Sequence, residues 1–498
     1  MTVLVQGPAW TEVGLDVRAG RYPLSVERHV MRMADHLVPG VTTVTPHARY
    51  YCLHALVATE VQTQDLMLPA AQDLLRRAEV ALATVSWAHQ HGEIGLPRAH
   101  GVDALAGWLN SGEVDMATAS QPGSSGYAES PWGFWNPYVA SEVTLGILAS
   151  GKLPTPGDRC DTAAVQAGLG ELLELARRDR LAVDEVASLG ATLCVCAGGR
   201  APDGEWLARL LCAPEAANGV DKRVSSSRGA TRRGTIRLLR RVVQTHPVAQ
   251  FTRDIAPVIA FGDFVAADEV ASRLTVTPLW QGVVLRNYAV GAWRRLWSWL
   301  VDQVSGLTPA TEVADRLADD LPVGTVAQFL DSLPATMTAA GSLAPAELQL
   351  RASDTPLPVT ELGVLAIGAQ RTNELSGRVA DAFLGQRGVE LGPEWMARRL
   401  NEAQAWPVRD FARQLVRDLL GRAQRVALAK ARRRTDGSLW LPTRLHERGG
   451  LLFRTSREGR GDVGLRLDQL GTVLAGAGLL RFDDDRWVVT AAGEVLLD

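Results

Sequence analysis

PGVTTVTPHARYYCLHALVAT, residues 39–59, contains the clearest helix start in this 498-residue chain and its densest cluster of polar side chains. Thr45 is a suitable N-cap, and Pro46 falls at the first helical position, where its fixed φ favours a helix. The apolar residues that follow recur every three or four positions, which predicts a helix from Pro46 to about residue 62. The stretch therefore predicts a helix with a polar start and one buried side.

Residues 25–37, which precede this stretch, read as a second helix that would fold back on the first as an antiparallel hairpin. Histidines and arginines of both helices would then face each other. In one interpretation they converge on an anion or a substrate, and in the other they close a helical interface. The candidate catalytic residues on the second helix are His47, Arg49, Tyr50 and His54.

Composition indicates a globular protein that is long enough for about three domains, with 46% hydrophobic residues and a net charge of −3. The five cysteines are scattered, and the first residues lack the basic and apolar regions of a signal peptide. No apolar run approaches the length of a transmembrane helix. We therefore expect a reduced, cytoplasmic protein without a membrane association.

Motif searches exclude the most easily recognised enzymes. Of the 52 basic residues 49 are arginines, and none of the three lysines lies in a phosphate-binding loop. Metalloprotease, serine-hydrolase and dinucleotide-binding signatures are also absent from the sequence. We therefore expect a non-catalytic protein that needs no cofactor, with an enzyme whose site carries no known motif as the alternative.

The histidines around residue 90 are the nearest approach to a metal-ligand cluster, with His89 and His91 as candidate ligands. Histidine is also favoured at a helix C-terminus by the helix dipole alone, so a purely structural role is the alternative. Cys194 and Cys196 fall in a segment, 183–198, that reads as one continuous helix. Two thiols two positions apart in a helix point in different directions, so we expect both to be core residues.

An arginine-rich segment follows, with eight basic residues and no acidic residue between positions 222 and 241. Arginines at this density fit contact with a phosphate backbone, although a solvated helix face or an acidic protein partner would explain them as well. The candidate nucleic-acid-binding residues in this segment are Arg228, Arg232, Arg233, Arg237, Arg240 and Arg241.

The C-terminal residues 409–498 carry 17 basic against 12 acidic residues, a net charge of +5. A long helix is predicted from Val408 to about residue 434. A shorter one follows from about 467 to 475, and then a β-hairpin turns at Asp483, Asp484 and Asp485. A last short helix at 491–497 closes the chain.

This order of helix, hairpin and helix resembles the second half of a winged-helix domain. In DNA-binding winged helices the recognition helix enters the major groove and the wing contacts the backbone. The resemblance therefore implies nucleic-acid contact by Arg466, Arg481 and Arg486, although the three aspartates at the wing tip would repel phosphate. Winged helices also serve as protein-interaction modules.

Residues 39–54 and the winged-helix-like end together resemble uncharacterised bacterial proteins of anti-phage defence or DNA-processing gene clusters. The expected fold is mainly α, multidomain and helical, with a C-terminal winged-helix-like (α+β) domain. Expected domains span 1–150, 151–250, 251–405 and 406–498. The expected function is that of a nucleic-acid-associated subunit, with DNA and proteins of a larger complex as partners, and a protein adaptor without nucleic-acid affinity as a further alternative.

Overall fold

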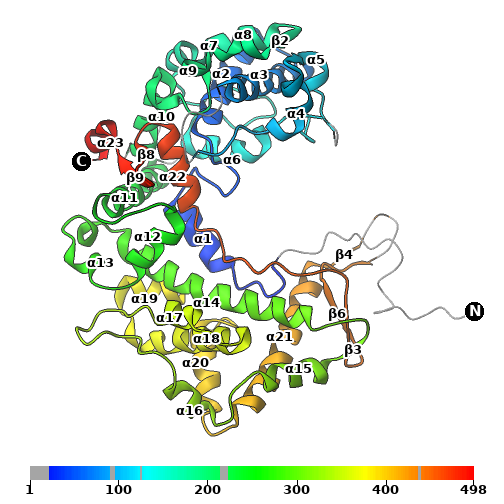
Figure 1. The fold of residues 1–498 in the computed structure, drawn as a ribbon, viewed down its shortest axis with the longest axis vertical. Helices are drawn as coiled ribbons and strands as arrows, with labels where there is room; N and C mark the ends of the chain where they lie inside the picture. The colour runs from blue at the N-terminus through cyan, green and yellow to red at the C-terminus, as the bar shows by residue number, and fades with distance from the viewer. Residues whose placement is uncertain are drawn as a thin grey trace, which may run out of the picture. The chain divides into compact units, whose positions relative to one another are not determined.

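The structure is a computed structural model that describes residues 22–89, 96–123, 126–213, 222–433, 435 and 439–497, with backbone only for 222–227 and 439. Helices make up 60% of the chain, and the strands are short and pair in antiparallel fashion (Figure 1). The expectation of a mainly α-helical protein is therefore confirmed. Within this described part, no helix combines the length and the apolar character needed to cross a membrane.

Packing divides the chain into two units that are built from interleaved segments. Unit 1 comprises the described residues of 1–33, 259–267 and 278–463, and unit 2 those of 34–258, 268–277 and 464–498. The segment 406–498 therefore contributes to both units. The four consecutive domains expected from the sequence remain a prediction about independent folding.

Unit 2 holds most of the N-terminal helices and the C-terminal hairpin. Its helices and strands are α2 (Ala48–Thr63), α3 (Leu68–Ala88), α4 (Val102–Ser111), β1 (Glu113–Asp115), α5 (Met116–Ala119), α6 (Trp135–Leu145), α7 (Thr162–Arg177), β2 (Arg180–Ala182), α8 (Val183–Ala187), α9 (Gly190–Leu193), η1 (Gly198–Arg200), α10 (Pro202–Cys212), α11 (Lys222–Thr245), η2 (Ala271–Arg273), α22 (Leu467–Gly476), β8 (Leu480–Asp483), β9 (Arg486–Val489) and α23 (Ala491–Leu497). Three helices contain residues of both units: α1 (Arg28–Leu37), α12 (Phe251–Ala260) and α14 (Thr277–Asp302).

Helix α2 is the centre of unit 2 and packs against α3, α7, α10 and α22. It is buried on nearly every side, whereas its periodicity predicted burial of one side only. The helix begins at Ala48 with His47 as N-cap, so the predicted start at Pro46 is two residues early. The Thr45 hydroxyl instead accepts a hydrogen bond from the Thr42 amide at 2.8 Å, which closes the turn before the helix.

The C-terminal elements of unit 2 match the order predicted from the sequence: α22, the β8–β9 hairpin and α23. Asp484 and Asp485 both have positive φ at the hairpin turn, where aspartate tolerates the left-handed region. Trp487 of β9 stacks on Phe251 at 4.8 Å between ring centroids, so the hairpin is held to α12 residues of the same unit. These contacts do not establish a winged-helix domain, which stays a prediction.

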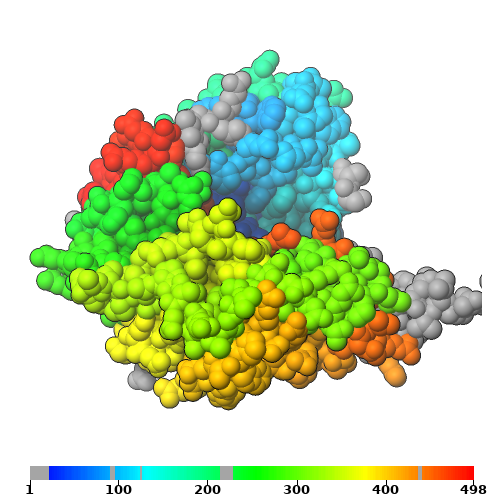
Figure 2. Space-filling model, turned by 60° about the horizontal axis from the view of Figure 1, so that its bottom comes forward, coloured from blue at the N-terminus to red at the C-terminus, as the bar shows by residue number. Residues whose placement is uncertain are grey.

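The described part of unit 1 is a helical assembly with two small sheets, a three-stranded one in which β7 lies between β3 and β6, and the two-stranded pair β4–β5. Its other elements are α13 (Phe264–Ala267), β3 (Thr308–Pro309), α15 (Ala310–Asp319), α16 (Val326–Asp331), α17 (Ala346–Ala352), α18 (Leu357–Glu374), α19 (Gly377–Leu384), α20 (Pro393–Glu402), α21 (Val408–Lys430), β4 (Arg432–Arg433), β5 (Leu439–Trp440), β6 (Leu445–Arg448) and β7 (Leu451–Arg454). Helix α15 packs along α21, and Figure 2 shows the corresponding yellow-green and orange segments side by side on the surface of this unit.

Candidate functional site

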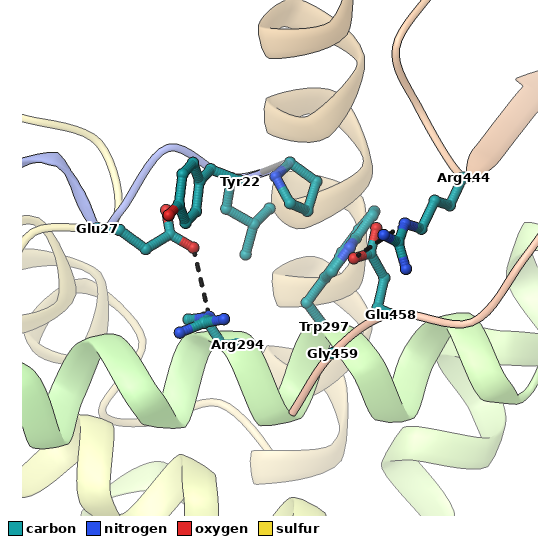
Figure 3. A pocket seen from close by; sticks show the side chains of 9 residues that line it. Tyr22, Glu27, Arg294, Trp297, Arg444, Glu458 and Gly459 are labelled. Carbon is teal, nitrogen blue, oxygen red and sulfur yellow. Dashed lines mark ion pairs between the residues drawn. The ribbon is translucent and has the colours of Figure 1, made fainter. Parts of the chain in front are cut away.

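A polar cavity of about 310 Å³ lies in unit 1, and we call it the Glu27 pocket. Three separated parts of the chain form it: the segment before α1, one face of α14, and the two ends of the β6–β7 hairpin (Figure 3). Arg294 and Trp297 are three residues apart on α14, so both side chains reach the same wall. The described residues that line it are Tyr22, Pro23, Leu24, Glu27, Arg294, Trp297, Arg444, Glu458 and Gly459.

The segment before α1 is held in place by the long helix α21. Arg422 donates to the carbonyl oxygen of Leu24 at 3.0 Å, and Lys430 donates to that of Tyr22 at 3.0 Å. Tyr22 and Ser25 both have positive φ, which is uncommon for residues other than glycine and costs conformational energy. Such strain is concentrated at ligand clamps and active sites. Here it occurs in the turn that forms one wall of the pocket.

Two ion pairs face each other in the pocket, and neither is short enough for a hydrogen bond. Arg294 Nε lies 3.5 Å from Glu27 Oε1, and Arg444 Nε lies 3.7 Å from Glu458 Oε2 (Figure 3). Glu27 is 1% exposed and Trp297 2% exposed. Within the described part of the chain, Glu27 Oε2, Trp297 Nε1 and Arg444 Nε have no hydrogen-bond partner. The pocket therefore offers one buried acceptor and two donors that make no hydrogen bond of normal geometry, both donors lying beside the Glu458 carboxylate.

Burial raises the pKa of Glu27, and its own backbone N–H and the positive charge of Arg294 only partly oppose this. Burial also raises the pKa of Glu458, against the charge of Arg444 and the nearby indole N–H of Trp297. The negative charge of Glu27 adds to the effect on Glu458. Each carboxylate is thus incompletely compensated, which is the electrostatic setting of a binding site for a group that donates hydrogen bonds.

Sequence reasoning missed this pocket. Its charged residues come from positions 27, 294, 444 and 458, and no local spacing connects them. The strained turn at Tyr22 and Ser25 leaves no signature in residue type. Only the folded chain brings these groups together.

Arg49, predicted as a candidate catalytic residue, is completely buried in unit 2 and fully engaged. Its Nε and Nη2 atoms each donate to the Asp203 carboxylate at 3.1 Å. Its Nη1 atom donates to the carbonyl oxygens of Thr192 and Cys194 at 2.5 and 2.8 Å. This arrangement agrees with the interpretation that Arg49 closes a helical interface.

His54 is also buried, and carboxylates bind both of its ring nitrogens. Glu142 lies 2.6 Å from Nδ1 and Glu79 lies 3.2 Å from Nε2. Burial alone would lower the pKa of His54, but the charges and hydrogen bonds of the two glutamates raise it to about 9. A protonated imidazolium with both nitrogens occupied has no free nitrogen with which to act as a base.

His47 and Tyr50 lie in an aromatic cluster beside His54. The His47 ring meets the His100 ring edge-on at 4.6 Å, and Tyr50 meets His100 at 4.7 Å. Burial lowers the pKa of His47 to about 3 and that of His100 to about 4. Both histidines are therefore neutral near pH 7, and the predicted convergence of positive charge on an anion does not occur at these two rings.

The arginine-rich segment lies within the single helix α11. Arg232 is 2% exposed and donates to the carbonyl oxygens of Leu210, Leu211 and Pro39. Arg233 donates to the carbonyl of Cys212, Arg240 pairs with Glu494, and Arg241 pairs with Asp268. Arg237 is half-buried, whereas Arg228 is exposed.

The candidate residues of the winged-helix-like end also include both an arginine that is bound within the protein and arginines that are exposed. Arg466 donates to the carbonyl of Val41 and pairs with Asp35. Arg481 pairs with Asp483 at 2.9 Å but is mostly exposed, and Arg486 is exposed. Helix α22 carries no basic residue, and it packs against α2 and η1. In this arrangement α22 has no basic face to place in a DNA groove.

His89 was predicted as a candidate metal ligand, and its partners are not those expected. His91 lies outside the described residues. Helix α9 ends at Leu193, so Cys194 and Cys196 follow it in a turn instead of lying within a continuous helix. Their sulfur atoms are 3.1 Å apart, and Cys196 Sγ is 3.6 Å from His89 Nδ1. The prediction that the two thiols point in different directions is therefore wrong.

Comparison with known proteins gives no independent indication of what either unit does. The chain was compared with protein families, with curated proteins and with solved structures. None of these comparisons finds a match.

Proposed function

We propose that this protein binds a small polar molecule in the Glu27 pocket. The observation that carries the proposal is the set of unsatisfied polar atoms on buried side chains that line a cavity, because buried polar atoms are normally hydrogen-bonded. A volume of about 310 Å³ is at the lower end of the range for ligand sites. The ligand is thus of the size of an amino acid or a nucleoside.

The charges of the pocket select the chemical class of this ligand. Two carboxylates and two guanidinium groups line it. A purely anionic molecule is therefore repelled by the carboxylates, and a purely cationic one by the guanidinium groups. A molecule with an amino or other N–H donor at one end and a carboxylate or carbonyl at the other satisfies both. The donor would bind Glu27 Oε2, and the acceptor would bind Arg444 and Trp297.

We expect zwitterionic amino acids or nucleosides to raise the melting temperature of the full chain, with Glu27→Gln weakening binding at least tenfold. The amide keeps the shape of the side chain but removes the negative charge that the donor group meets. A thermal-shift screen of free amino acids, polyamines and nucleosides would identify the class, and calorimetric titration would give the affinities.

Glu402→Gln is the matched control, because Glu402 lies in the same unit with an exposed side chain. It should bind the ligand as the unmodified chain does. If no zwitterion or nucleoside stabilises the protein, or if Glu27→Gln binds as tightly as Glu402→Gln, the pocket does not have this function.

Nucleic-acid contact within a larger assembly is a second candidate function. What favours it is the exposure of Arg228, Arg481 and Arg486 in unit 2, among the nine arginines predicted to bind phosphate. Contacts of this kind are independent of base sequence and depend strongly on salt. The buried arginines of α11 would have a structural role in either case.

For this second candidate we expect weak, salt-sensitive DNA binding that Arg228→Gln with Arg486→Gln reduces without unfolding the protein. Removing two phosphate contacts should make the slope of log affinity against log salt shallower by about 2. The comparison variant is Arg232→Gln, which should destabilise the fold because three carbonyl oxygens lose their donor. Binding that is absent at low salt, or unchanged in the double variant, would argue against this function.

A further inference from the structure

His89, Cys194 and Cys196 form a compact group in unit 2 that is independent of the Glu27 pocket, and we call it the thiol cluster. Their candidate ligand atoms all lie within 4.8 Å of one another. Cys194 is 0% exposed and Cys196 5% exposed, whereas His89 is half-buried at the end of α3. The imidazole therefore connects two buried sulfur atoms with the surface.

The local backbone explains why the side chains of Cys194 and Cys196 point in the same direction. The amide of Cys194 donates to the carbonyl of Gly190 at 3.1 Å, which completes the last turn of α9, and the chain then leaves the helix. The Val195 amide donates to the Ser86 hydroxyl at 3.0 Å, which holds the turn against α3. Arg49 fixes the same turn through the carbonyl of Cys194.

The separations in the cluster are close to those of a zinc site. Zn–S bonds of about 2.3 Å and Zn–N bonds of about 2.0 Å at tetrahedral angles place sulfur and nitrogen roughly 3.5 Å apart and two sulfurs roughly 3.8 Å apart. Cys196 Sγ and His89 Nδ1 are 3.6 Å apart, and the two sulfurs are 3.1 Å apart. The third separation, between His89 and Cys194, is at most 4.8 Å. A bound ion would therefore require the sulfur pair to open by about 0.7 Å and His89 to approach Cys194 by at most about 1.3 Å.

The hydrogen bonds of the cluster agree with this fit. The thiol and the backbone N–H of Cys196 both point at Cys194 Sγ, at 3.1 and 3.4 Å, so this sulfur already lies among groups that would stabilise a thiolate. Binding of a divalent ion would replace the proton between the sulfurs, form two thiolate bonds and one imidazole bond, and release up to two protons to solvent.

We propose that His89, Cys194 and Cys196 bind one thiophilic divalent metal ion, with Zn²⁺ as the best match to the ligands. Two thiolates and an imidazole are the donors that zinc prefers, whereas Mg²⁺ and Ca²⁺ prefer oxygen. Three protein ligands leave a fourth position for water or for an external ligand.

Cobalt provides the test, because Co²⁺ bound to thiolate gives a charge-transfer absorption that counts the sulfur ligands. The full chain, first treated with a chelator and a reductant, should develop this absorption up to one equivalent of Co²⁺ and lose it when Zn²⁺ is added. Cys194→Ser and Cys196→Ser should each reduce the absorption and weaken binding at least tenfold. Cys160→Ser is the control, because Cys160 is a free cysteine of the same unit that lies outside the cluster.

A glycine provides a second variant that leaves all three ligands in place. A Cβ at Gly190 would lie 2.5 Å from Cβ and Cγ of His89, so Gly190→Ala should displace the imidazole and weaken Co²⁺ binding roughly 10–100-fold. Gly107→Ala is its control, since nothing lies within 4 Å of the added methyl group in α4. This pair decides the question if the cysteine variants fail to fold.

The proposal is overturned if the reduced chain shows no stoichiometric absorption. It is overturned equally if the absorption persists in both cysteine variants, or if Gly190→Ala binds as Gly107→Ala does. A Cys194–Cys196 disulfide that forms in air, combined with no Co²⁺ binding after reduction, would identify a dithiol instead of a metal site.

Discussion

Replacing Arg49 by alanine is expected to lower the free energy of unfolding by about 3–5 kcal/mol. The substitution leaves the Asp203 carboxylate buried without its positive partner, since both side chains are 0% exposed. It also removes the donors to the carbonyl oxygens of Thr192 and Cys194. Breaking a buried pair in this way costs more than the pair contributes, because an uncompensated charge remains in the interior.

The matched control is Arg180→Ala, which removes a pair that joins β2 to β1 in the same unit. Arg180 and Glu113 are 68% and 52% exposed, so their pair is screened by water and contributes less than about 1 kcal/mol. Chemical denaturation followed by fluorescence and circular dichroism would measure both variants. A loss below about 1 kcal/mol for Arg49→Ala would show that Asp203 becomes hydrated or protonated at little cost.

Arg49 also shows why a polar cluster on a strong helix does not by itself identify an active site. The sequence placed the start of the helix to within two residues, because proline and apolar spacing act locally. It could not place Asp203, which lies 154 positions away and determines what Arg49 does. A helical interface and a catalytic site would therefore have the same residues in the sequence. Only the side chains that Arg49 contacts in the folded protein distinguish the two.

The elements that the sequence predicted best are those with a complete local pattern. The β8–β9 hairpin was expected from alternating residues around three aspartates, and it forms there. The sheet of β3, β7 and β6 was missed for two reasons. Thr308 of β3 pairs with Leu452 of β7 across a long separation, and the local β6–β7 hairpin was overlooked although a Gly449-Gly450 turn is a hairpin signal. Short strands that pair at long range are specified by tertiary packing, which a local pattern does not contain.

The candidate sites were also predicted poorly wherever they depend on contacts between distant parts of the chain. Cys194 and Cys196 were misread because their segment was treated as one helix, although α8 ends at Ala187 and α9 begins at Gly190. Arginine density at α11 predicted a basic surface, yet one face of the helix turns Arg232 into the interior. Charge composition gives the number of arginines but not which of them face solvent.

The second large effect concerns the imidazolium of His54, and it makes stability depend on pH in a defined window. The pKa of His54 is about 9 in the folded protein, against about 6.5 in an unfolded chain. The stabilisation from its proton is therefore complete below about pH 6.5 and is lost as the pH rises through about 9. A difference of this size corresponds to a few kcal/mol, on the order of 3, over the whole window.

His54→Gln is expected to remove most of this dependence and to lower stability at pH 7, because Glu79 and Glu142 then face each other without the positive charge between them. The neighbouring His47 and His100 have pKa values near 3 and 4 when folded, against about 6.5 when unfolded, so they reduce stability below about pH 7. This contribution is present in both proteins and cancels in the difference between the unmodified chain and His54→Gln. Unfolding measured from pH 6 to 9.5 would test this, with His36→Gln on α1 as the exposed control. Parallel curves for the unmodified chain and His54→Gln would mean that His54 is neutral in the folded protein. In that case one of the two glutamates must carry the proton, since two buried carboxylates cannot both remain charged beside a neutral imidazole.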